Sequence, residues 1–186
     1  ERVEYKNLRK KYEVEGNEVK ADFYDQKQYT QKILLNSMYG AAALPVVRYY
    51  DLENAMSVTT TGQAMIKYAE RAGNHYYKEK LGIEKDYCIY IDTDSLFFSA
   101  LPLIQKNDKS VDVTNHDTMV ELTLKECEKF QDYINTSLNM FAKRMINIDE
   151  HRFVFKQEVI APNGIFISKK RYSLWIIDSE GMRVDE

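Results

Sequence analysis

The feature that most constrains the fold is a pair of short strand-like segments separated by a group of small polar residues. The segments Asp86–Ile91 and Leu96–Ser99 are rich in aromatic and β-branched residues, which favour extended backbone. Between them lies Asp92-Thr93-Asp94-Ser95, whose residue types are compatible with a turn. This arrangement predicts a β-hairpin with acidic residues at its tip.

Two helical patterns precede this hairpin. Arg2–Glu13 is a highly charged helical segment, and Asp22–Tyr39 carries apolar residues at near-helical spacing. The turn-forming sequence Glu15-Gly16-Asn17 connects them, so we expect two helices packed antiparallel. Gly40 and Pro45 are predicted to close this helical hairpin.

The rest of the chain carries two more helical patterns and two strand patterns. Helices are predicted over Asn54–Leu81 and His116–Ile146, the second with one continuous apolar face. Strands are predicted over Phe153–Ile160 and Ile165–Ile177, with a break at Pro162-Asn163-Gly164. Helices thus segregate from antiparallel strands, and the predicted fold class is α+β, an antiparallel sheet with packed helices plus a two-helix hairpin.

Size and charge exclude several classes of protein. A chain of 186 residues forms one domain, or one domain with a small appendage. With 26 Lys and Arg against 29 Asp and Glu, the net charge of −3 gives no global signal for nucleic acid. The longest apolar run, Ala41–Val47, is far short of the roughly 20 residues of a membrane span, and no secretory leader is visible. Because the chain begins at Glu1 and stops at Glu186 without an obvious cap, we interpret it as a piece of a longer protein.

The cysteines, histidines and glycines support no familiar site. No C-x-x-C pair occurs, so structural zinc is not supported, and two separated cysteines in apolar surroundings indicate a reducing compartment. The three histidines are scattered, and no nucleophile elbow or glycine-rich phosphate loop is present.

Asp92 and Asp94 are the candidate metal ligands. Two carboxylates at a hairpin tip make a hard, oxygen-rich site of the kind that Mg²⁺ prefers and often shares with substrate phosphates. Aspartate is also common in turns that bind nothing, so the pair alone leaves both interpretations open.

Candidate nucleotide-binding residues lie on the two N-terminal helices, where a lysine, an amide and a phenol in a row can bind phosphate, sugar and base. Lys32, Asn36 and Tyr39 are spaced to share one helix face, and so are Arg2 and Lys6. If the two helices pack as a hairpin, three cations can converge on a triphosphate. The alternative is a pair of solvated helix faces.

A basic segment, Lys169-Lys170-Arg171-Tyr172, lies near the C-terminal end. On a strand, Lys169 and Arg171 would point to one side and Lys170 and Tyr172 to the other. Such a segment can hold a nucleic-acid backbone, although it can also be an ordinary charged strand end.

Taken together, these segments resemble the motifs of family B DNA polymerases. Lys32–Gly40 is similar to K-x-x-x-N-S-x-Y-G, Tyr90–Ser95 to Y-x-D-T-D-S, and Lys169–Tyr172 to K-K-R-Y, in the same order along the chain. Arg48–Leu52 and Thr60–Gln63 resemble the T-even phage members in particular. The resemblance covers nearly the whole chain and implies fingers over residues 1–44 and part of the palm over residues 45–186.

The resemblance also implies roles for the residues of the reaction centre. Asp94 would be a direct ligand of two Mg²⁺ ions, for which Mn²⁺ can substitute, and Asp92 a neighbouring carboxylate. Lys32 would act in catalysis and, with Asn36, contact the incoming triphosphate. Arg2 and Lys6 would grip its outer phosphates.

Further implied roles concern the DNA. Tyr39 and Gly40 would lie against the nascent base pair. Lys170 and Tyr172 would hold the primer terminus, with Lys169 and Arg171 beside them. Glu158 would correspond to a further acidic residue near the metals.

By this resemblance the chain is part of a DNA-directed DNA polymerase that uses a dNTP and a primer–template. The family carries another metal-binding aspartate in a D-x-x-S-L-Y-P-S motif upstream, which is absent here together with the exonuclease and a recognisable thumb. We therefore expect the chain to be inactive alone and to work with missing segments or a split subunit, and with a sliding clamp through the parent chain. An intracellular, virus-encoded setting is implied. Two alternatives stay open: a non-catalytic relic that binds DNA or a partner, and a D-x-D nucleotidyl-sugar transferase.

Overall fold

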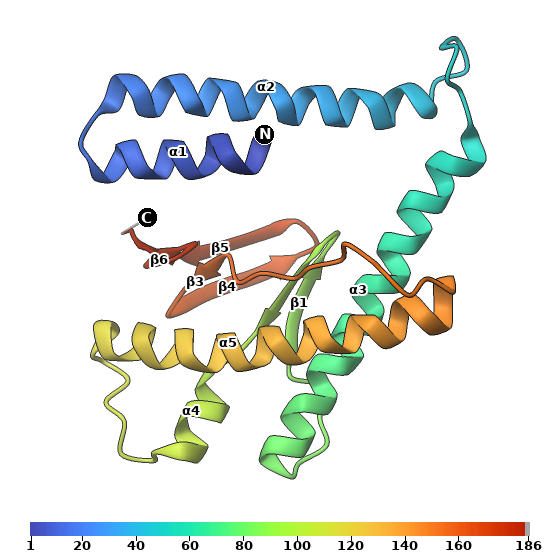
Figure 1. The fold of residues 1–186 in the computed structure, drawn as a ribbon. Helices are drawn as coiled ribbons and strands as arrows, with labels where there is room; N and C mark the ends of the chain where they lie inside the picture. Colours follow the sequence, from blue (N-terminus) through green and yellow to red (C-terminus); the bar gives the residue numbers. More distant parts are fainter. Residues whose placement is uncertain (185–186) are drawn as a thin grey trace. The chain divides into compact units, whose positions relative to one another are not determined.

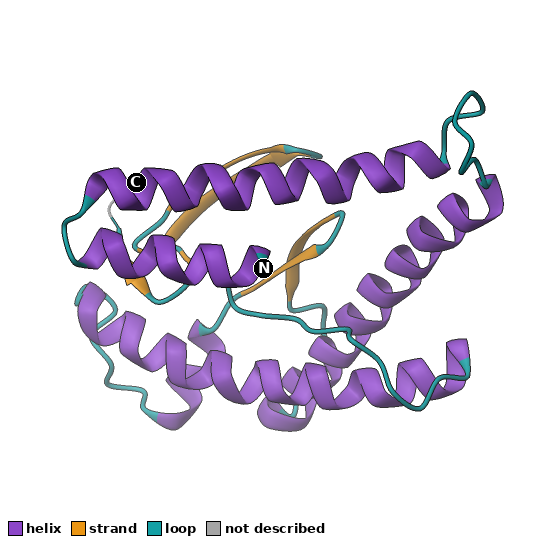
Figure 2. Cartoon of the chain, turned by 45° about the horizontal axis from the view of Figure 1, so that its top comes forward, coloured by secondary structure: helices purple, strands orange, loops and turns teal. Residues whose placement is uncertain are grey.

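The computed structural model describes residues 1–184 and consists of helices and small antiparallel sheets, which confirms the α+β prediction (Figures 1 and 2). The chain divides into two compact units, Glu1–Thr60 and the remainder from Thr61. The boundary lies within helix α3 (Leu52–Leu81). Among the described residues, no helix combines the length and apolar character needed to cross a membrane.

The first unit contains the predicted helical hairpin. Helices α1 (Arg2–Val14) and α2 (Glu18–Ala42) run antiparallel and pack along each other (Figure 1). The turn between them lies at the predicted residues. Gly16 adopts a left-handed φ of 69°, and the Asn17 side chain caps α2 by accepting a hydrogen bond from the Lys20 N–H at 3.2 Å. This cap makes α2 begin four residues before the predicted Asp22.

The end of α2 differs from the prediction. Gly40 lies inside the helix, which continues to Ala42, and it does not adopt the left-handed conformation of a terminating glycine. The N–H of Ala43 instead bonds back to the Gly40 carbonyl at 3.2 Å and tightens the last turn. Pro45 follows shortly after, where it cannot continue the helix.

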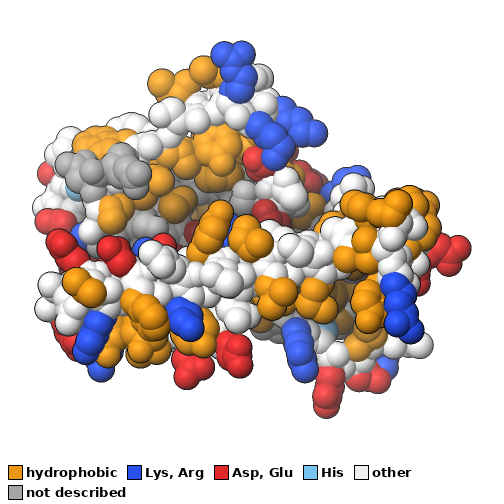
Figure 3. Space-filling model, turned by 90° about the horizontal axis from the view of Figure 1, so that it is seen from above, with side chains coloured by type: hydrophobic (Ala, Val, Ile, Leu, Met, Phe, Trp, Pro, Cys, Tyr) orange, Lys and Arg blue, Asp and Glu red, His pale blue; other side chains and the backbone are white. Residues whose placement is uncertain are grey.

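Large apolar side chains remain exposed on α2. Hydrophobic, basic and acidic side chains are interspersed on the face shown in Figure 3. Ile33, Leu34, Leu35 and Met38 are each about half exposed or more. Such exposure along one helix is typical of a surface that contacts other protein or a ligand.

The second unit has a core rich in tyrosine. Helices α4 (Leu101–Asn107) and α5 (His116–Phe141) pack against the C-terminal part of α3. The buried cluster at their contact consists of Tyr76, Tyr77, Tyr87 and Leu103. The Tyr77 hydroxyl is buried with a partner, since it donates to the Ser99 carbonyl at 2.8 Å.

Two helical details differ from the prediction. The α-helix over His116–Ile146 ends at Phe141 and continues as one π-helical turn, Ala142–Ile146, before Asn147 adopts a left-handed φ of 58°. Helix α4 was not predicted, because one short helix that begins with Leu101-Pro102 is too brief to show a periodic apolar pattern.

The strands form three separate small sheets instead of one palm sheet. One hairpin pairs β1 (Cys88–Asp92) with β2 (Ser95–Phe98), and another pairs β4 (Asn163–Ser168) with β5 (Arg171–Trp175). The third sheet has the order β3 (Val159–Ile160), β6 (Asp178–Ser179), β7 (Met182–Arg183). Every pairing is antiparallel, as predicted.

The predicted strand Phe153–Ile160 is wrong over most of its length, since only Val159–Ile160 is paired as a strand. The backbone before it bonds to side chains of α5. The Asn135 amide both donates to the Phe155 carbonyl at 2.9 Å and accepts from the Phe155 N–H at 2.8 Å, and Gln131 accepts from the Gln157 N–H at 2.9 Å. These side chains replace the neighbouring strand that the backbone would otherwise need.

The predicted strand Ile165–Ile177 is a hairpin that already begins at Asn163. Ser168 pairs with Arg171, so Lys169 and Lys170 form its two-residue turn. The prediction that Lys169 and Lys170 alternate across a strand is therefore wrong, and Lys170 adopts a left-handed φ of 62°.

Candidate functional site

The β1–β2 hairpin places the two candidate metal ligands at its tip. Asp92 pairs with Ser95 across the hairpin, so Thr93 and Asp94 form a two-residue turn. The Asp94 N–H donates to the Asp92 carbonyl at 2.6 Å, and the Ser95 hydroxyl donates to the same carbonyl at 3.1 Å. Thr93 has a φ of 51°, which is uncommon for a β-branched residue and indicates that the turn is held by its hydrogen bonds.

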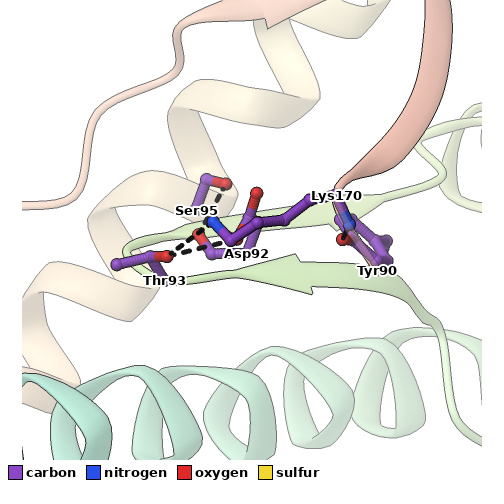
Figure 4. A network of polar contacts seen from close by, with 5 residues as sticks. All are labelled: Tyr90, Asp92, Thr93, Ser95 and Lys170. Carbon is purple, nitrogen blue, oxygen red and sulfur yellow. Dashed lines mark hydrogen bonds and ion pairs between the residues drawn. The ribbon is translucent and has the colours of Figure 1, made fainter. Parts of the chain in front are cut away.

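The Asp92 carboxylate is directed at a lysine from the other hairpin (Figure 4). Its side chain is 18% exposed, and Oδ1 lies 2.8 Å from the Lys170 Nζ and 3.1 Å from the Thr93 hydroxyl. The hydrogen bond from Lys170 lowers the pKa of Asp92 below its ordinary value. The same contact raises the pKa of Lys170, so the lysine is an ammonium group and Asp92 a carboxylate at neutral pH.

Asp94 is exposed beside this ion pair. Residues 1–184 hold no group of three or more His, Cys, Asp or Glu side chains that could enclose a metal, so Glu158 does not complete such a group with Asp92 and Asp94. Two carboxylates nevertheless suit Mg²⁺, which keeps waters and substrate phosphates in its coordination shell. The donor chemistry fits Mg²⁺ as part of a site that other groups complete.

Lys170 is fixed by its backbone as well as by its ammonium group (Figure 4). The Lys170 N–H donates to the Tyr90 hydroxyl at 2.6 Å, and its Nζ reaches the hairpin tip. This contact joins residues 78 positions apart in the sequence. Lys170 has a left-handed backbone, and both its backbone N–H and its ammonium group are hydrogen-bonded. These constraints hold its positive charge beside Asp92.

Four aromatic rings hold the two hairpins together. Tyr90 pairs with Phe97 across the first hairpin, and Phe166 pairs with Tyr172 across the second. The ring centroids of Tyr90 lie 5.2 Å from Phe166 and 5.3 Å from Tyr172, and Phe97 lies 5.6 Å from both. Aromatic pairs at these separations add about 0.5–1.5 kcal/mol each beyond the area they bury. This aromatic cluster sets the position of Lys170 relative to Asp92.

The remaining residues of the basic segment are more open. Lys169 and Arg171 are exposed on either side of Lys170, and Tyr172 is 38% exposed while contributing to the aromatic cluster. Of the four residues predicted to bind DNA here, Lys170 and Tyr172 are thus positioned by contacts with the β1–β2 hairpin.

The candidate nucleotide-binding residues lie in the first unit. Lys32 and Asn36 are exposed one helical turn apart on α2. Tyr39 is 42% exposed, and its hydroxyl donates to the Ala55 carbonyl at 3.4 Å. Gly40 has open space where a Cβ would lie, so no contact within the structure requires glycine there.

The packing of α1 on α2 indicates where Arg2 lies relative to Lys32. The ion pair between Arg9 and Asp25, at 3.6 Å, fixes the register of the helices. Arg2 lies seven residues before Arg9, and Lys32 seven residues after Asp25. Because seven residues make about two helical turns, Arg2 and Lys32 lie level with each other on the side of that ion pair. Lys6, half-buried, lies one turn along α1 from Arg2.

The sequence did not reveal the positioning role of Tyr90 and the aromatic cluster. Two signals were present, namely an aromatic residue, Tyr90, two positions before Asp92 and aromatic residues at Phe166 and Tyr172 around the basic turn. Neither indicates contact between the hairpins, because the residues are far apart in the chain.

Comparison with known proteins identifies a family model and several relatives. The model for DNA polymerase family B matches residues 1–183. A DNA-directed DNA polymerase of Escherichia phage RB69 is 34% identical over 169 residues, which cover 86% of this chain and 18% of that protein. A DNA-directed DNA polymerase of Enterobacteria phage T4 is 28% identical over 93% of this chain and 20% of that protein, and a DNA polymerase of Pyrococcus glycovorans is 26% identical over 96% and 18%. The chain therefore spans about a fifth of the length of the relatives it matches.

Proposed function

Because this chain belongs to DNA polymerase family B, we propose that it forms the fingers (residues 1–44) and part of the palm (residues 45–186) of a DNA-directed DNA polymerase. The main support is the contact between Lys170 and Asp92, which joins two polymerase-like motifs that are distant in sequence. In such an enzyme, a primer 3′-hydroxyl attacks the α-phosphorus of a dNTP, and pyrophosphate leaves.

Asp94 and Asp92 would bind divalent cations at the hairpin tip. Bound Mg²⁺, or Mn²⁺ in its place, supplies charge stabilisation at the transferring phosphoryl group. Asp92 is a carboxylate, whose pKa Lys170 lowers further, and its Oδ1 is held by the Lys170 ammonium, so a cation would bind the other oxygen or replace this contact. Asp94 is the more open of the two and would bind more directly.

Lys32 and Arg2 would bind the triphosphate. Both are exposed at the same level of the helical hairpin, so two cations can contact one polyphosphate chain. Lys6 and Asn36 lie one turn away from them and would add further contacts. Tyr39 and Gly40, near the end of α2, would lie against the nascent base pair, where the open space around Gly40 leaves room for a base.

Lys170 would hold the primer terminus. The hydrogen bond of its N–H to Tyr90 and the contact between the Tyr90 and Tyr172 rings hold the turn in place. The ammonium group could therefore leave Asp92 and bind a primer phosphate or base edge while the turn stays where it is. Lys169, Arg171 and Tyr172 would contact the adjoining backbone of the DNA.

We infer that other polypeptide completes the enzyme. Two carboxylates are fewer than a two-metal site needs, and the D-x-x-S-L-Y-P-S aspartate is absent from this sequence. The exposed apolar residues of α2 offer a surface for such polypeptide. The chain alone should therefore bind a nucleotide and DNA weakly and catalyse no extension.

A primer-extension assay tests whether the chain needs another polypeptide for catalysis. The 186-residue chain is assayed on a fluorescent primer–template with dNTPs and Mg²⁺, alone and after co-expression with the segment that carries the missing aspartate. We expect extension only in the second case, with loss of activity in Asp94→Asn. Extension by the isolated chain would contradict the need for a completing segment. DNA binding without extension in the co-expressed protein would favour the non-catalytic relic.

Manganese binding tests the metal site separately from catalysis. Mn²⁺ bound to the chain is measured by electron paramagnetic resonance for the parent, for Asp94→Asn and for Asp112→Asn, an exposed aspartate in another turn, as matched control. We expect weaker Mn²⁺ binding only in Asp94→Asn. Equal loss in both variants, or no loss in either, would exclude this hairpin as the cation site.

A further inference from the structure

A hollow of about 480 Å³ lies in the second unit between the end of α3, the segment before β1 and helix α4. We call its apolar lining residues, Leu81, Ile83, Tyr87 and Pro102, the floor, and its polar lining residues the rim. Ile83 is 60% exposed and therefore presents most of its side chain to solvent. The floor therefore offers water-exposed apolar surface to an apolar side chain of a ligand.

The rim of the hollow is basic. Lys85, Lys106 and Lys109 line it together with Gln105, and no carboxylate does. Three acidic residues neighbour these lining residues in sequence. Glu84 forms a 2.6 Å ion pair with Lys78, whereas Asp86 and Asp108 accept hydrogen bonds from uncharged donors. The rim therefore carries three lysine charges, which the nearby carboxylates of Asp86 and Asp108 offset in part.

The rim lysines are partly ordered before any ligand binds. The Lys106 ammonium donates to the Lys80 carbonyl at the end of α3, and the Lys85 ammonium lies 4.9 Å above the Tyr87 ring. Lys109 makes no such contact within the described residues. These contacts restrict Lys85 and Lys106, so less side-chain entropy is lost when they pair with a ligand, whereas Lys109 keeps its freedom.

We propose that this hollow binds a short acidic segment of a partner protein, with an apolar side chain on the floor and carboxylates paired with the rim lysines. A nucleic-acid backbone would use the charges but not Leu81, Ile83 and Pro102, so the apolar floor favours a peptide. Paired charges at the rim would steer association and fix orientation, while the apolar contact supplies most of the affinity.

The hollow is separated from the candidate reaction centre. Tyr87 directly precedes β1, and Asp92 ends that strand. A strand of five residues at about 3.3 Å per residue places the two about 17 Å apart. A partner bound at the hollow would leave the hairpin tip accessible to substrates.

Fluorescence anisotropy with a labelled peptide tests the docking surface. The probe is a short peptide with a central Leu-Phe pair flanked by glutamates, measured at near-physiological salt against the 186-residue chain. The variants are Lys109→Glu and Ile83→Ser, which change exposed side chains and spare the helix contacts of Lys106. Lys67→Glu is the matched control, an exposed lysine on α3 about 21 Å along the helix from Leu81.

We expect Lys109→Glu and Ile83→Ser each to weaken peptide binding on the order of tenfold, and Lys67→Glu to leave it unchanged. Circular dichroism confirms that all three variants remain folded. Absence of peptide binding, or equal loss in Lys67→Glu, would overturn the inference. It would also be overturned if a single-stranded oligonucleotide bound in place of the peptide and responded to Lys109→Glu but not to Ile83→Ser.

Discussion

At Gly73, helix α3 closely approaches the β1–β2 hairpin. A Cβ added there would lie 2.5 Å from Cζ of Phe98 on β2 and 3.0 Å from Cζ of Phe130 on α5. The two rings cannot simply turn away, since Phe98 packs on Phe130 at 5.0 Å and on Tyr77 at 5.5 Å between ring centroids. Gly73→Ala should therefore displace β2, the strand that leads back to the candidate metal hairpin. Gly62, in the same helix, has open space at the corresponding point.

The two glycines allow the packing cost to be separated from helix propensity. Replacement of a mid-helix glycine by alanine stabilises a helix by about 0.5–1 kcal/mol. Gly62→Ala should gain that amount. In Gly73→Ala, overpacking costs about 1–3 kcal/mol and offsets the same gain. We expect Gly73→Ala to be about 1–2 kcal/mol less stable than the parent and about 2 kcal/mol less stable than Gly62→Ala.

Urea unfolding followed by tryptophan fluorescence measures this difference. The single tryptophan, Trp175, lies on β5 and reports on the second unit. The free energies of unfolding of the parent, Gly62→Ala and Gly73→Ala are compared at equal denaturant slope. If Gly73→Ala were as stable as the parent, or if both variants shifted equally, the close approach of α3 to Phe98 would not control the packing.

Three more outcomes follow from the structure. Leu138→Ala, at a fully buried position of α5, should lower the free energy of unfolding by about 2–5 kcal/mol, whereas Met140→Ala, 52% exposed, should change it by no more than about 0.5 kcal/mol in the same titration. Tyr90→Phe keeps the ring but removes the acceptor for the Lys170 N–H. We expect the free energy of unfolding to fall by about 1 kcal/mol and primer–template binding, measured by anisotropy, to weaken. If neither value changed, this hydrogen bond would not contribute to stability or to DNA binding. Burial raises the pKa of the Cys88 and Cys127 thiols from 9.0 to about 11, because the folded chain favours the neutral thiol. The resulting stabilisation of the folded state is present below pH 9 and is lost as the pH rises towards 11. Alkylation of these thiols at pH 8 should accordingly be on the order of 100-fold slower in the folded chain than in urea, and equal rates would contradict their burial.

Local patterns in the sequence predicted the helical hairpin, the two long helices and the acidic hairpin, but not helix α4 or the β4–β5 hairpin. The turn Gly16-Asn17 and its flanking periodicity predicted two antiparallel helices, and the polar residues between Ile91 and Leu96 predicted the acidic hairpin. These features depend on neighbouring residues, which supply the turn geometry, the cap and the apolar face. The motifs also indicated the polymerase family, which the comparison with known proteins confirmed.

Errors arose where distant residues supply the hydrogen bonds. Phe153–Gln157 has the composition of a strand, but Asn135 and Gln131 on α5 satisfy its backbone and leave no strand partner. The basic segment reads as a strand by alternation, but pairing of Ser168 with Arg171 makes its lysines a turn. A chain's pattern shows that a segment is extended and cannot show which partner its backbone will find.

The sequence by itself determined the residue types of the candidate site, its hairpin and the family to which the chain belongs. Only the tertiary structure determined that Lys170 reaches Asp92 and that Tyr90 holds the Lys170 backbone. The physical reason is that four aromatic rings from the two hairpins must pack together before Lys170 can reach Asp92. The two residues are 78 positions apart in the sequence. Such packing arises when the whole unit folds, and no local periodicity encodes it.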